Sequence, residues 1–227
     1  MKIKDLPTSI PNQIWPYFLL CILLTLLAVL VPKGDDVLWI NSRHNEWMDQ
    51  WFALYTNLGD GLIFIPLVIF TLYLRFEYTM MCVSVCLMSG LIVSLLKRIV
   101  FDPSPRPAAI LDNSLLHFVG GIDVHHAHSF PSGHTCTAFC AALVLTLISR
   151  NRVVAVLGLV AAGLVAYSRI YLLQHFLIDT AAGATIGCLS TLLIWVLFES
   201  FEKPTWMQKK LVWRFSNKVK QKESIDG

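Results

Sequence analysis

The chain has 227 residues, of which 56% are hydrophobic and only 15% are charged, with a formal net charge of +3. Soluble domains carry about 25% charged residues, so this composition excludes an ordinary soluble domain. It predicts an all-α, polytopic membrane protein whose environment is the lipid bilayer, and we expect no nucleic-acid partner.

Six apolar runs predict six transmembrane helices. In chain order they cover residues 14–31, 58–74, 79–96, 135–149, 153–168 and 176–198. A membrane-spanning helix needs roughly 17 to 25 residues, so the shorter second, fourth and fifth runs are expected to extend into polar neighbours or to cross a thinned bilayer. We interpret the first run as a retained helix, because the apolar part of a cleaved signal has about 7 to 15 residues. The predicted organisation is a six-helix transmembrane domain, residues 1–202, followed by a basic cytoplasmic tail, residues 203–227.

The distribution of lysine and arginine predicts the orientation. With six spans, both termini lie on one side, and that side carries twelve of the 18 lysine and arginine residues, against six on the other. Cytoplasmic loops hold the excess of these residues. We therefore predict a multi-pass protein of the bacterial cytoplasmic (inner) membrane with both termini in the cytoplasm.

The same topology gathers ionisable residues at one end of the helices. Lys97 ends the third predicted helix and His134 opens the fourth, while Arg169 ends the fifth and His175 opens the sixth. Ionisable side chains are costly at such positions and mark functional sites. We predict one active site at the outer, periplasmic face, within the motif region 97–179.

His175 and Asp179 are the first candidate catalytic pair. Residues four apart share a face of a helix, so the carboxylate can reach the imidazole, fix its tautomer and favour the imidazolium form, leaving the other nitrogen free to attack. This is the arrangement of a nucleophile and its orienting group. The alternative is a polar pair that only packs two helices together.

The segment Pro131-Ser132-Gly133-His134 precedes an apolar helix. Gly133 permits close approach of a ligand to the backbone, and the N–H groups at a helix start bind anions. Ser132 adds a hydroxyl donor, and His134 is placed to protonate a leaving oxygen as a general acid. The alternative is simple capping of the helix by Ser132.

Three cations complete the predicted site. Arg106, Arg169 and Lys97 offer fixed positive charge to a phosphoryl transition state. Arg98 could replace Lys97, but we favour Lys97 because it directly follows the apolar helix.

These residues resemble the signature of the type 2 phosphatidic acid phosphatase superfamily in three blocks: residues 97–107, residues 131–134, and Ser168-Arg169 with His175 and Asp179. The second and third blocks match residue for residue, whereas eight residues instead of six separate Lys97 from Arg106. The two additional residues, around Pro103-Ser104, could form a bulge that leaves Lys97 in its role.

The resemblance implies a covalent mechanism without metal or cofactor. His175 would form a phosphohistidine with the support of Asp179, and His134 would protonate the leaving group and then activate water. The three cations and the Gly133 amide would bind the phosphate oxygens.

A histidine cluster offers a competing metal hypothesis. His117, His125, His126 and His128 lie in the loop of residues 98–131, near Asp112 and Asp123. Imidazole with carboxylate is plausible zinc chemistry, but these residues could equally contact lipid headgroups.

The leading functional hypothesis is an integral-membrane phosphatase acting on a lipid phosphate or diphosphate. The candidate substrates are phosphatidylglycerol phosphate, phosphatidic acid, undecaprenyl diphosphate and the phosphates of lipid A. The alternatives are a phosphotransferase that passes the phosphoryl group to another lipid, a vanadate-dependent haloperoxidase, and a transporter or anion-binding membrane protein without turnover.

Overall fold

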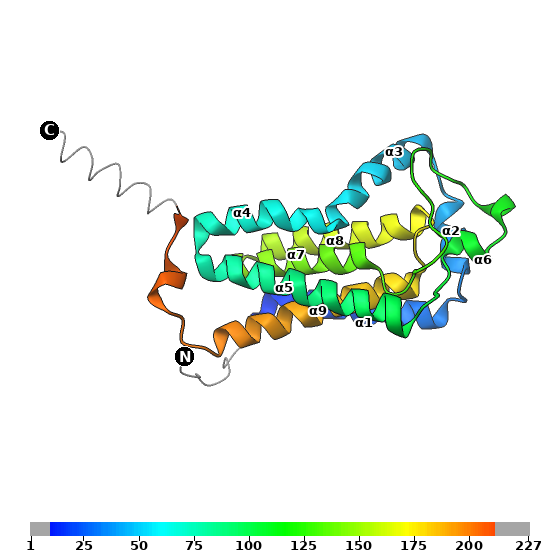
Figure 1. The fold of residues 1–227 in the computed structure, drawn as a ribbon. Helices are drawn as coiled ribbons and strands as arrows, with labels where there is room; N and C mark the ends of the chain where they lie inside the picture. Colours follow the sequence, from blue (N-terminus) through cyan, green and yellow to red (C-terminus); the bar gives the residue numbers. More distant parts are fainter. Residues whose placement is uncertain (1–9, 212–227) are drawn as a thin grey trace.

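In the computed structural model, which describes residues 10–211, the secondary structure is entirely helical (Figure 1). The α-helices are α1 (Trp15–Leu30), α2 (Asp35–Asn41), α3 (Glu46–Tyr55), α4 (Phe64–Leu74), α5 (Phe76–Leu95), α6 (Pro107–Ile110), α7 (Gly133–Ser149), α8 (Arg152–Tyr171) and α9 (Leu177–Glu199). Short helical turns join them at Asn12–Ile14, Thr56–Gly59, Gly61–Ile63, Leu96–Val100, Asn113–Leu115 and Thr205–Gln208. The all-α membrane fold class is thus confirmed.

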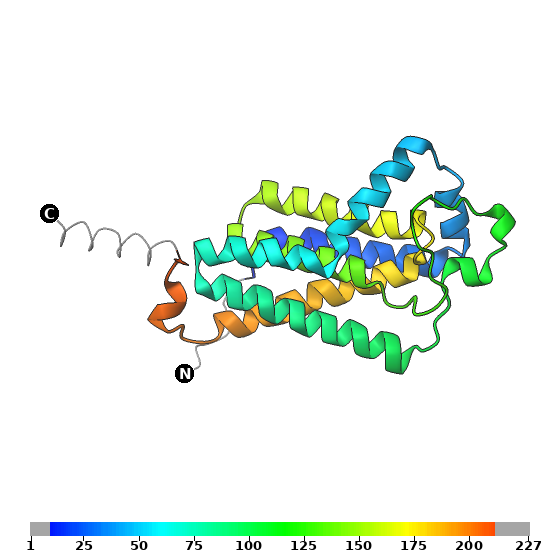
Figure 2. The same cartoon turned by 45° about the horizontal axis from the view of Figure 1, so that its top comes forward.

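Four helical segments are long and apolar enough to cross a membrane by themselves: Asn12–Leu30, Phe76–Val100, Arg152–Tyr171 and Leu177–Glu199. A fifth candidate is the pair Glu46–Gly59 and Gly61–Leu74, which bends by 62° at the break. In Figure 2, α3 leans away from the direction of α4 at this bend. The second apolar run, residues 58–74, predicted the α4 part of this pair, whereas no expectation for α2 and α3 came from the sequence, and the structure adds these two helices.

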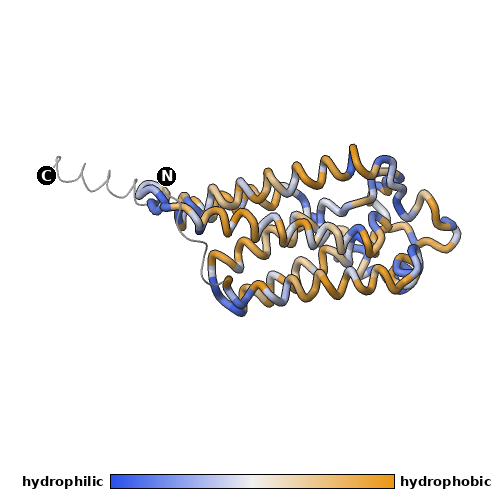
Figure 3. The backbone as a smooth tube through the Cα atoms, turned by 90° about the horizontal axis from the view of Figure 1, so that it is seen from below, coloured by the Kyte–Doolittle hydropathy of each residue, from blue (hydrophilic) through white to orange (hydrophobic). Residues whose placement is uncertain are grey.

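Helix α7 lies at the centre of the bundle and has its most extensive contacts with α8, α9 and α5. Eleven of its 17 residues are buried, whereas α1 buries only Tyr17 and Cys21. A helix enclosed by other helices needs little apolar surface for lipid. This position accounts for the short apolar run at residues 135–149. The hydropathy colouring in Figure 3 shows the apolar middle of the bundle between two more polar ends.

Two glycines bring α9 close to α7. Gly183 and Gly187 face α7, and a Cβ added to Gly187 would lie 2.6 Å from the carbonyl oxygen of Cys136. A Cβ added to Gly183 would clash with the carbonyl oxygen of Ser132. Small residues spaced four apart allow such close approach between membrane helices. The contact places the first turn of α7 beside the first turns of α9.

One end of the bundle, here called the capped end, is covered by α2, α3, α6 and the long loop of residues 98–131 (Figure 1). A second hydrophobic cluster fills this end, and Val37, Phe52, Tyr171 and Phe176 are among its buried members. This cluster ties the additional helices to the turn between α8 and α9. The capped end is therefore a packed layer over the helix ends rather than a set of independent loops.

The opposite end holds the α4–α5 and α7–α8 turns and the end of α9 (Figure 1). Buried Glu77 there forms ion pairs with Arg75 at 3.5 Å and Lys203 at 3.6 Å. Arg150 and Arg152 lie in the α7–α8 turn. Of the predicted tail, residues 203–227, the structure describes residues 203–211, and the rest lies outside the described residues.

Candidate active site

The turn between α8 and α9 places Arg169 and His175 side by side. After α8 ends at Tyr171, the chain folds back, and the backbone N–H groups of Gln174 and His175 both donate to the carbonyl oxygen of Arg169, at 2.9 and 3.1 Å. His175 is 2% exposed and Arg169 is 7% exposed. The third sequence block therefore forms a single buried turn at the capped end.

Asp179 lies in the first turn of α9, where its Oδ2 accepts hydrogen bonds from the Phe176 N–H at 3.0 Å and the Ser129 hydroxyl at 2.5 Å. The same oxygen lies 3.4 Å from His175 Nδ1, which is longer than an ordinary N–H···O hydrogen bond. Within residues 10–211, His175 Nδ1 has no hydrogen-bond partner. The predicted pair is thus brought together, with the carboxylate already held by two other donors.

The environment of His175 favours its neutral form. Burial lowers the pKa of His175 well below the ordinary value of 6.5, and the positive charges of Arg169, Arg106 and Lys97 lower it further. The expectation that Asp179 favours the imidazolium is therefore wrong, because removal from water and three nearby cations outweigh one carboxylate. A neutral imidazole keeps the lone pair that a nucleophile needs.

The second block opens α7. Ser132 is the N-cap of α7, and its Oγ accepts hydrogen bonds from the backbone N–H of Thr135 at 3.4 Å and from the Thr135 hydroxyl at 3.0 Å. The Ser132 N–H donates to the Asp179 carbonyl oxygen at 3.0 Å. The capping interpretation of Ser132 is therefore correct for the local structure, and this contact also fixes the start of α7 against α9.

Gly133 and His134 form the first turn of α7. A Cβ added to Gly133 would meet only Val93, at 3.8 Å, so steric crowding within the described residues does not require glycine there. His134 is half-buried and lies against Gly59, where an added Cβ would be 2.9 Å from the His134 Cβ. The absence of a side chain at Gly59 thus lets this turn approach the start of α7 closely.

Arg106 and Arg169 are each held by neutral partners. Arg106 donates from Nε to the Ala127 carbonyl oxygen at 2.9 Å and from NH1 to Gln174 Oε1 at 2.5 Å. Arg169 donates from NH1 to Thr56 Oγ1 at 2.7 Å, and its buried Nε has no partner in the described part of the chain. Burial lowers the pKa of Arg106, yet an arginine stays protonated at neutral pH. Among the residues that the structure describes, no carboxylate neutralises either guanidinium group by direct contact.

Lys97 lies in the π-helical turn Leu96–Val100 that ends the α5 segment. Its side chain is half-buried and its charge is among those that act on His175, whereas Arg98 is exposed. The geometry therefore favours Lys97 over Arg98 as the first cation. Ser104 is not a free bulge, because its carbonyl oxygen and hydroxyl accept hydrogen bonds from the N–H groups of Ser129 and Phe130, at 2.9 and 3.0 Å.

A family model described as the PAP2 superfamily matches residues 77–203, a range that includes all three blocks. The chain belongs to the PAP2 superfamily.

Two solved structures resemble this PAP2 superfamily member. LpxE of Aquifex aeolicus shares 28% sequence identity and a TM-score of 0.65, over 73% of this chain and 95% of that chain. A phosphatidylglycerolphosphate phosphatase from Bacillus subtilis shares 21% identity and a TM-score of 0.55, over 84% and 98% of the two chains, which establishes a common fold. A lipid A 1-phosphatase of Porphyromonas gingivalis is 38% identical over 88 residues, which are 37% of this chain and 20% of that protein. The match thus spans about a fifth of that relative's length.

The metal cluster that the sequence suggested in the long loop of this PAP2 superfamily member does not assemble as expected. His128 pairs with Asp102 at 3.1 Å, and Asp112 caps the turn Asn113–Leu115. Among residues 10–211, the one group of possible metal ligands that lie close together combines His117 with two residues outside that loop, His44 and Asp49. Sequence proximity within a loop did not predict which side chains meet.

Several polar residues that form hydrogen bonds with the candidate site residues were not predicted from the sequence. Thr56 and Gln174 orient the two arginines, and Ser129 binds Asp179. Gln174 directly precedes His175 of the third block, and Ser129 lies two residues before the second block. This proximity to the blocks is the sequence feature that could have identified them. Thr56 lies far from every block, so only the fold brings it to Arg169.

Proposed function

We propose that the protein is an integral-membrane lipid phosphatase that hydrolyses a phosphomonoester or diphosphate headgroup through a phosphohistidine intermediate. The observation that carries this proposal is a buried His175 whose Nδ1 lies 3.4 Å from Asp179, with the charges of Arg169, Arg106 and Lys97 close enough to lower its pKa. The cations attract a phosphate, and the neutral imidazole can attack its phosphorus atom. A protein that only binds anions needs the cations and has no use for the His175 and Asp179 pair.

In the proposed first step, His175 attacks phosphorus through Nε2, because Nδ1 faces Asp179. The bond from phosphorus to the lipid oxygen breaks, and His134, which takes up a proton as the negatively charged headgroup enters, donates that proton to the leaving oxygen. Neutral His134 then takes a proton from water, which attacks the phosphohistidine and releases inorganic phosphate. The three cations and the N–H groups at the start of α7 stabilise the charge on the phosphoryl oxygens.

We further propose six membrane spans, with the bent α3–α4 pair and the central α7 as the two additional crossings. The capped end with the active site then faces the periplasm, and both termini lie in the cytoplasm of a bacterial cell, at its inner membrane. The arginines of the α4–α5 and α7–α8 turns support this orientation, because they lie at the end opposite the site. The periplasmic orientation gives access to lipids of the outer leaflet.

Labelling of single cysteines tests the orientation. In a background without the native thiols, a cysteine at Ser114 in the long loop reacts with an impermeant maleimide in intact spheroplasts, whereas one at exposed Gln208 does not. Both positions should react after the membrane is permeabilised. The opposite pattern would place the site in the cytoplasm.

The lipid substrate is tested by phosphate release. We propose the 1-phosphate of lipid A as the first candidate, on the basis of the 38% identity to a lipid A 1-phosphatase. The purified protein in mixed micelles is assayed with lipid A, phosphatidylglycerol phosphate, phosphatidic acid and undecaprenyl diphosphate. His175→Ala is the inactive control and His125→Ala, in the exposed part of the long loop, is the matched active control. No release from any of the four lipids would contradict the proposal.

The phosphotransferase alternative uses the same intermediate. A lipid labelled in its phosphate, incubated with an acceptor lipid, distinguishes the two outcomes. Label in inorganic phosphate supports hydrolysis, and label in the acceptor lipid supports transfer.

A further inference from the structure

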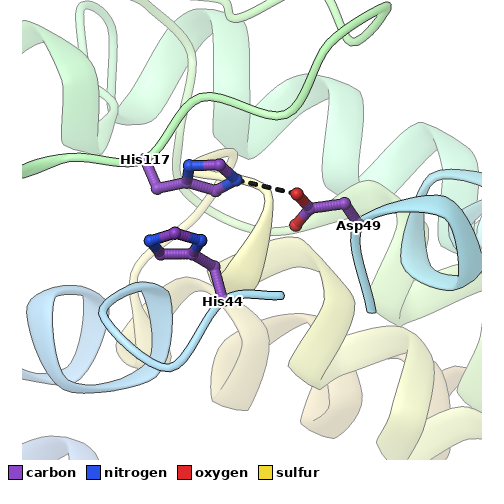
Figure 4. A group of neighbouring side chains, drawn as sticks. All are labelled: His44, Asp49 and His117. Atoms are coloured by element: carbon purple, nitrogen blue, oxygen red, sulfur yellow. Dashed lines mark hydrogen bonds and ion pairs between the residues drawn. The ribbon is translucent and has the colours of Figure 1, made fainter. Parts of the chain in front are cut away.

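A group of three side chains at the capped end lies outside the catalytic machinery (Figure 4). His44 lies in the turn between α2 and α3, Asp49 lies on α3, and His117 lies on the long loop. One ligand atom from each residue lies within 4.8 Å of the other two. Segments that are distant in sequence thus place possible nitrogen and oxygen ligands close together.

Two of these possible ligands, Asp49 and His117, are held in place by hydrogen bonds. Asp49 Oδ1 accepts a hydrogen bond from the Tyr171 hydroxyl at 2.5 Å, and Asp49 Oδ2 lies 2.8 Å from His117 Nε2. The backbone N–H and carbonyl oxygen of His117 are both bound by the Asn41 side chain, at 2.7 and 2.9 Å. Ligands supported by outer hydrogen bonds are characteristic of metal sites in proteins.

His44 is the residue that a simple hydrogen-bond network leaves unexplained. Its exposed ring is stacked on the His117 ring at 3.6 Å between centroids, with 8° between the planes. Within the described residues, the His44 ring forms no hydrogen bond. The lone pair of an imidazole lies in the plane of its ring, so two parallel rings do not point at one ion. The exposed His44 ring must therefore turn out of the stack to bind, and solvent leaves it room to do so.

We propose that His44, Asp49 and His117 bind a divalent transition-metal ion of the zinc class. Two imidazole nitrogens and one carboxylate oxygen, with water as the fourth ligand, suit tetrahedral Zn²⁺. The ion displaces the hydrogen bond between His117 Nε2 and Asp49 Oδ2, and the proton of that bond is released to solvent. Mg²⁺ and Ca²⁺ prefer oxygen ligands and fit this donor set poorly.

The bound ion fastens the long loop to α3 and, through Tyr171, to the end of α8. The long loop carries Arg106 and Ser129, and the end of α8 carries Arg169, so the ion stiffens the support of the active site without contacting it. The proposal concerns residues with no role in the phosphate chemistry. It stands or falls separately from the proposed phosphatase activity.

Isothermal titration of the purified, chelator-treated protein in detergent with ZnCl₂ tests the proposal, with MgCl₂ as the comparison and thermal unfolding as the second readout. We expect one Zn²⁺ bound per chain. At about a 100-fold excess over the dissociation constant, the unfolding temperature should rise by about 5 to 10 °C. His44→Ala should weaken Zn²⁺ binding at least about tenfold, and His125→Ala should bind Zn²⁺ as the wild type does.

His44 makes the result decisive, because its exposed side chain can be removed without disturbing the buried layer. Asp49→Asn, which keeps the shape of the side chain and removes its charge, should also weaken Zn²⁺ binding. The proposal is overturned if the wild type binds no Zn²⁺ in the micromolar range. Equal binding by the wild type and His44→Ala would likewise overturn it and leave His117, Asp49 and Tyr171 as a hydrogen-bond network alone.

Discussion

Replacement of Lys97 by alanine tests the assignment of the first cation. Lys97 is half-buried and acts on His175, whereas Arg98, the next residue in the same π-helical turn, is exposed. Arg98→Ala removes the same formal charge from the adjacent position. The two variants therefore separate a charge that contacts the phosphate from a charge that only contributes to the general field.

The expected loss follows from the burial of Lys97. Unit charges about 4 Å apart interact by about 4 kcal/mol at an effective dielectric constant of about 20, and part of this is offset by the cost of removing the ammonium from water. Removal of one donor from a transition-state site costs about 2.7 to 4 kcal/mol, or about 10² to 10³ in rate. We expect Lys97→Ala to lower kcat/KM at least about 100-fold. Salt and water screen the exposed guanidinium, so Arg98→Ala should change kcat/KM by less than about threefold.

Phosphate release at subsaturating lipid measures kcat/KM for both variants, and thermal unfolding in detergent checks that both remain folded. A second readout is the titration of His175, since loss of the Lys97 charge should raise the His175 pKa. If Arg98→Ala is the damaging change and Lys97→Ala is mild, the assignment is reversed and the half-buried position of Lys97 has been misinterpreted.

Three further outcomes are expected. Asp179→Asn should lower kcat by about 10- to 100-fold, because the amide oxygen can still accept the Ser129 hydroxyl but orients His175 less well, and an unchanged kcat would remove Asp179 from the mechanism. The pKa of His175 is lowered in the folded state, so the unfolded state binds a proton at this residue below pH 6.5 while the folded state does not. The free energy of unfolding should therefore fall as the pH decreases from about 7.5 to about 5.5, by up to about 1.4 kcal/mol per pH unit. The unfolding temperature of His175→Ala should fall less over this pH range than that of the wild type. Vanadate, which mimics the phosphoryl transition state, should inhibit phosphate release, whereas EDTA should leave the initial rate intact below the unfolding temperature; loss of activity in EDTA with recovery in zinc would show that the chemistry depends on a metal.

The sequence by itself determined the class of the protein and indicated its candidate site residues. A low charged fraction requires a membrane environment, and apolar runs long enough to cross it require helices, since only helices and closed barrels satisfy the backbone there. The polar blocks stood out because ionisable residues beside apolar runs are costly without a function. These are local properties of the chain, and they are sufficient to indicate that His134, Arg169, His175 and Asp179 share one end of the bundle.

The tertiary structure decided the properties that depend on distant contacts. The lowered pKa of His175 follows from its burial and from the charges of Arg169, Arg106 and Lys97, the last two of which lie on other segments of the chain. The choice between Lys97 and Arg98 depends on which face of a π-helical turn is covered. The grouping of His117 with His44 and Asp49 requires that α3 and the long loop fold over the same end. The burial of a side chain, the electrostatic field at it and its distance to other groups depend on contacts throughout the bundle, so no local sequence pattern predicts them.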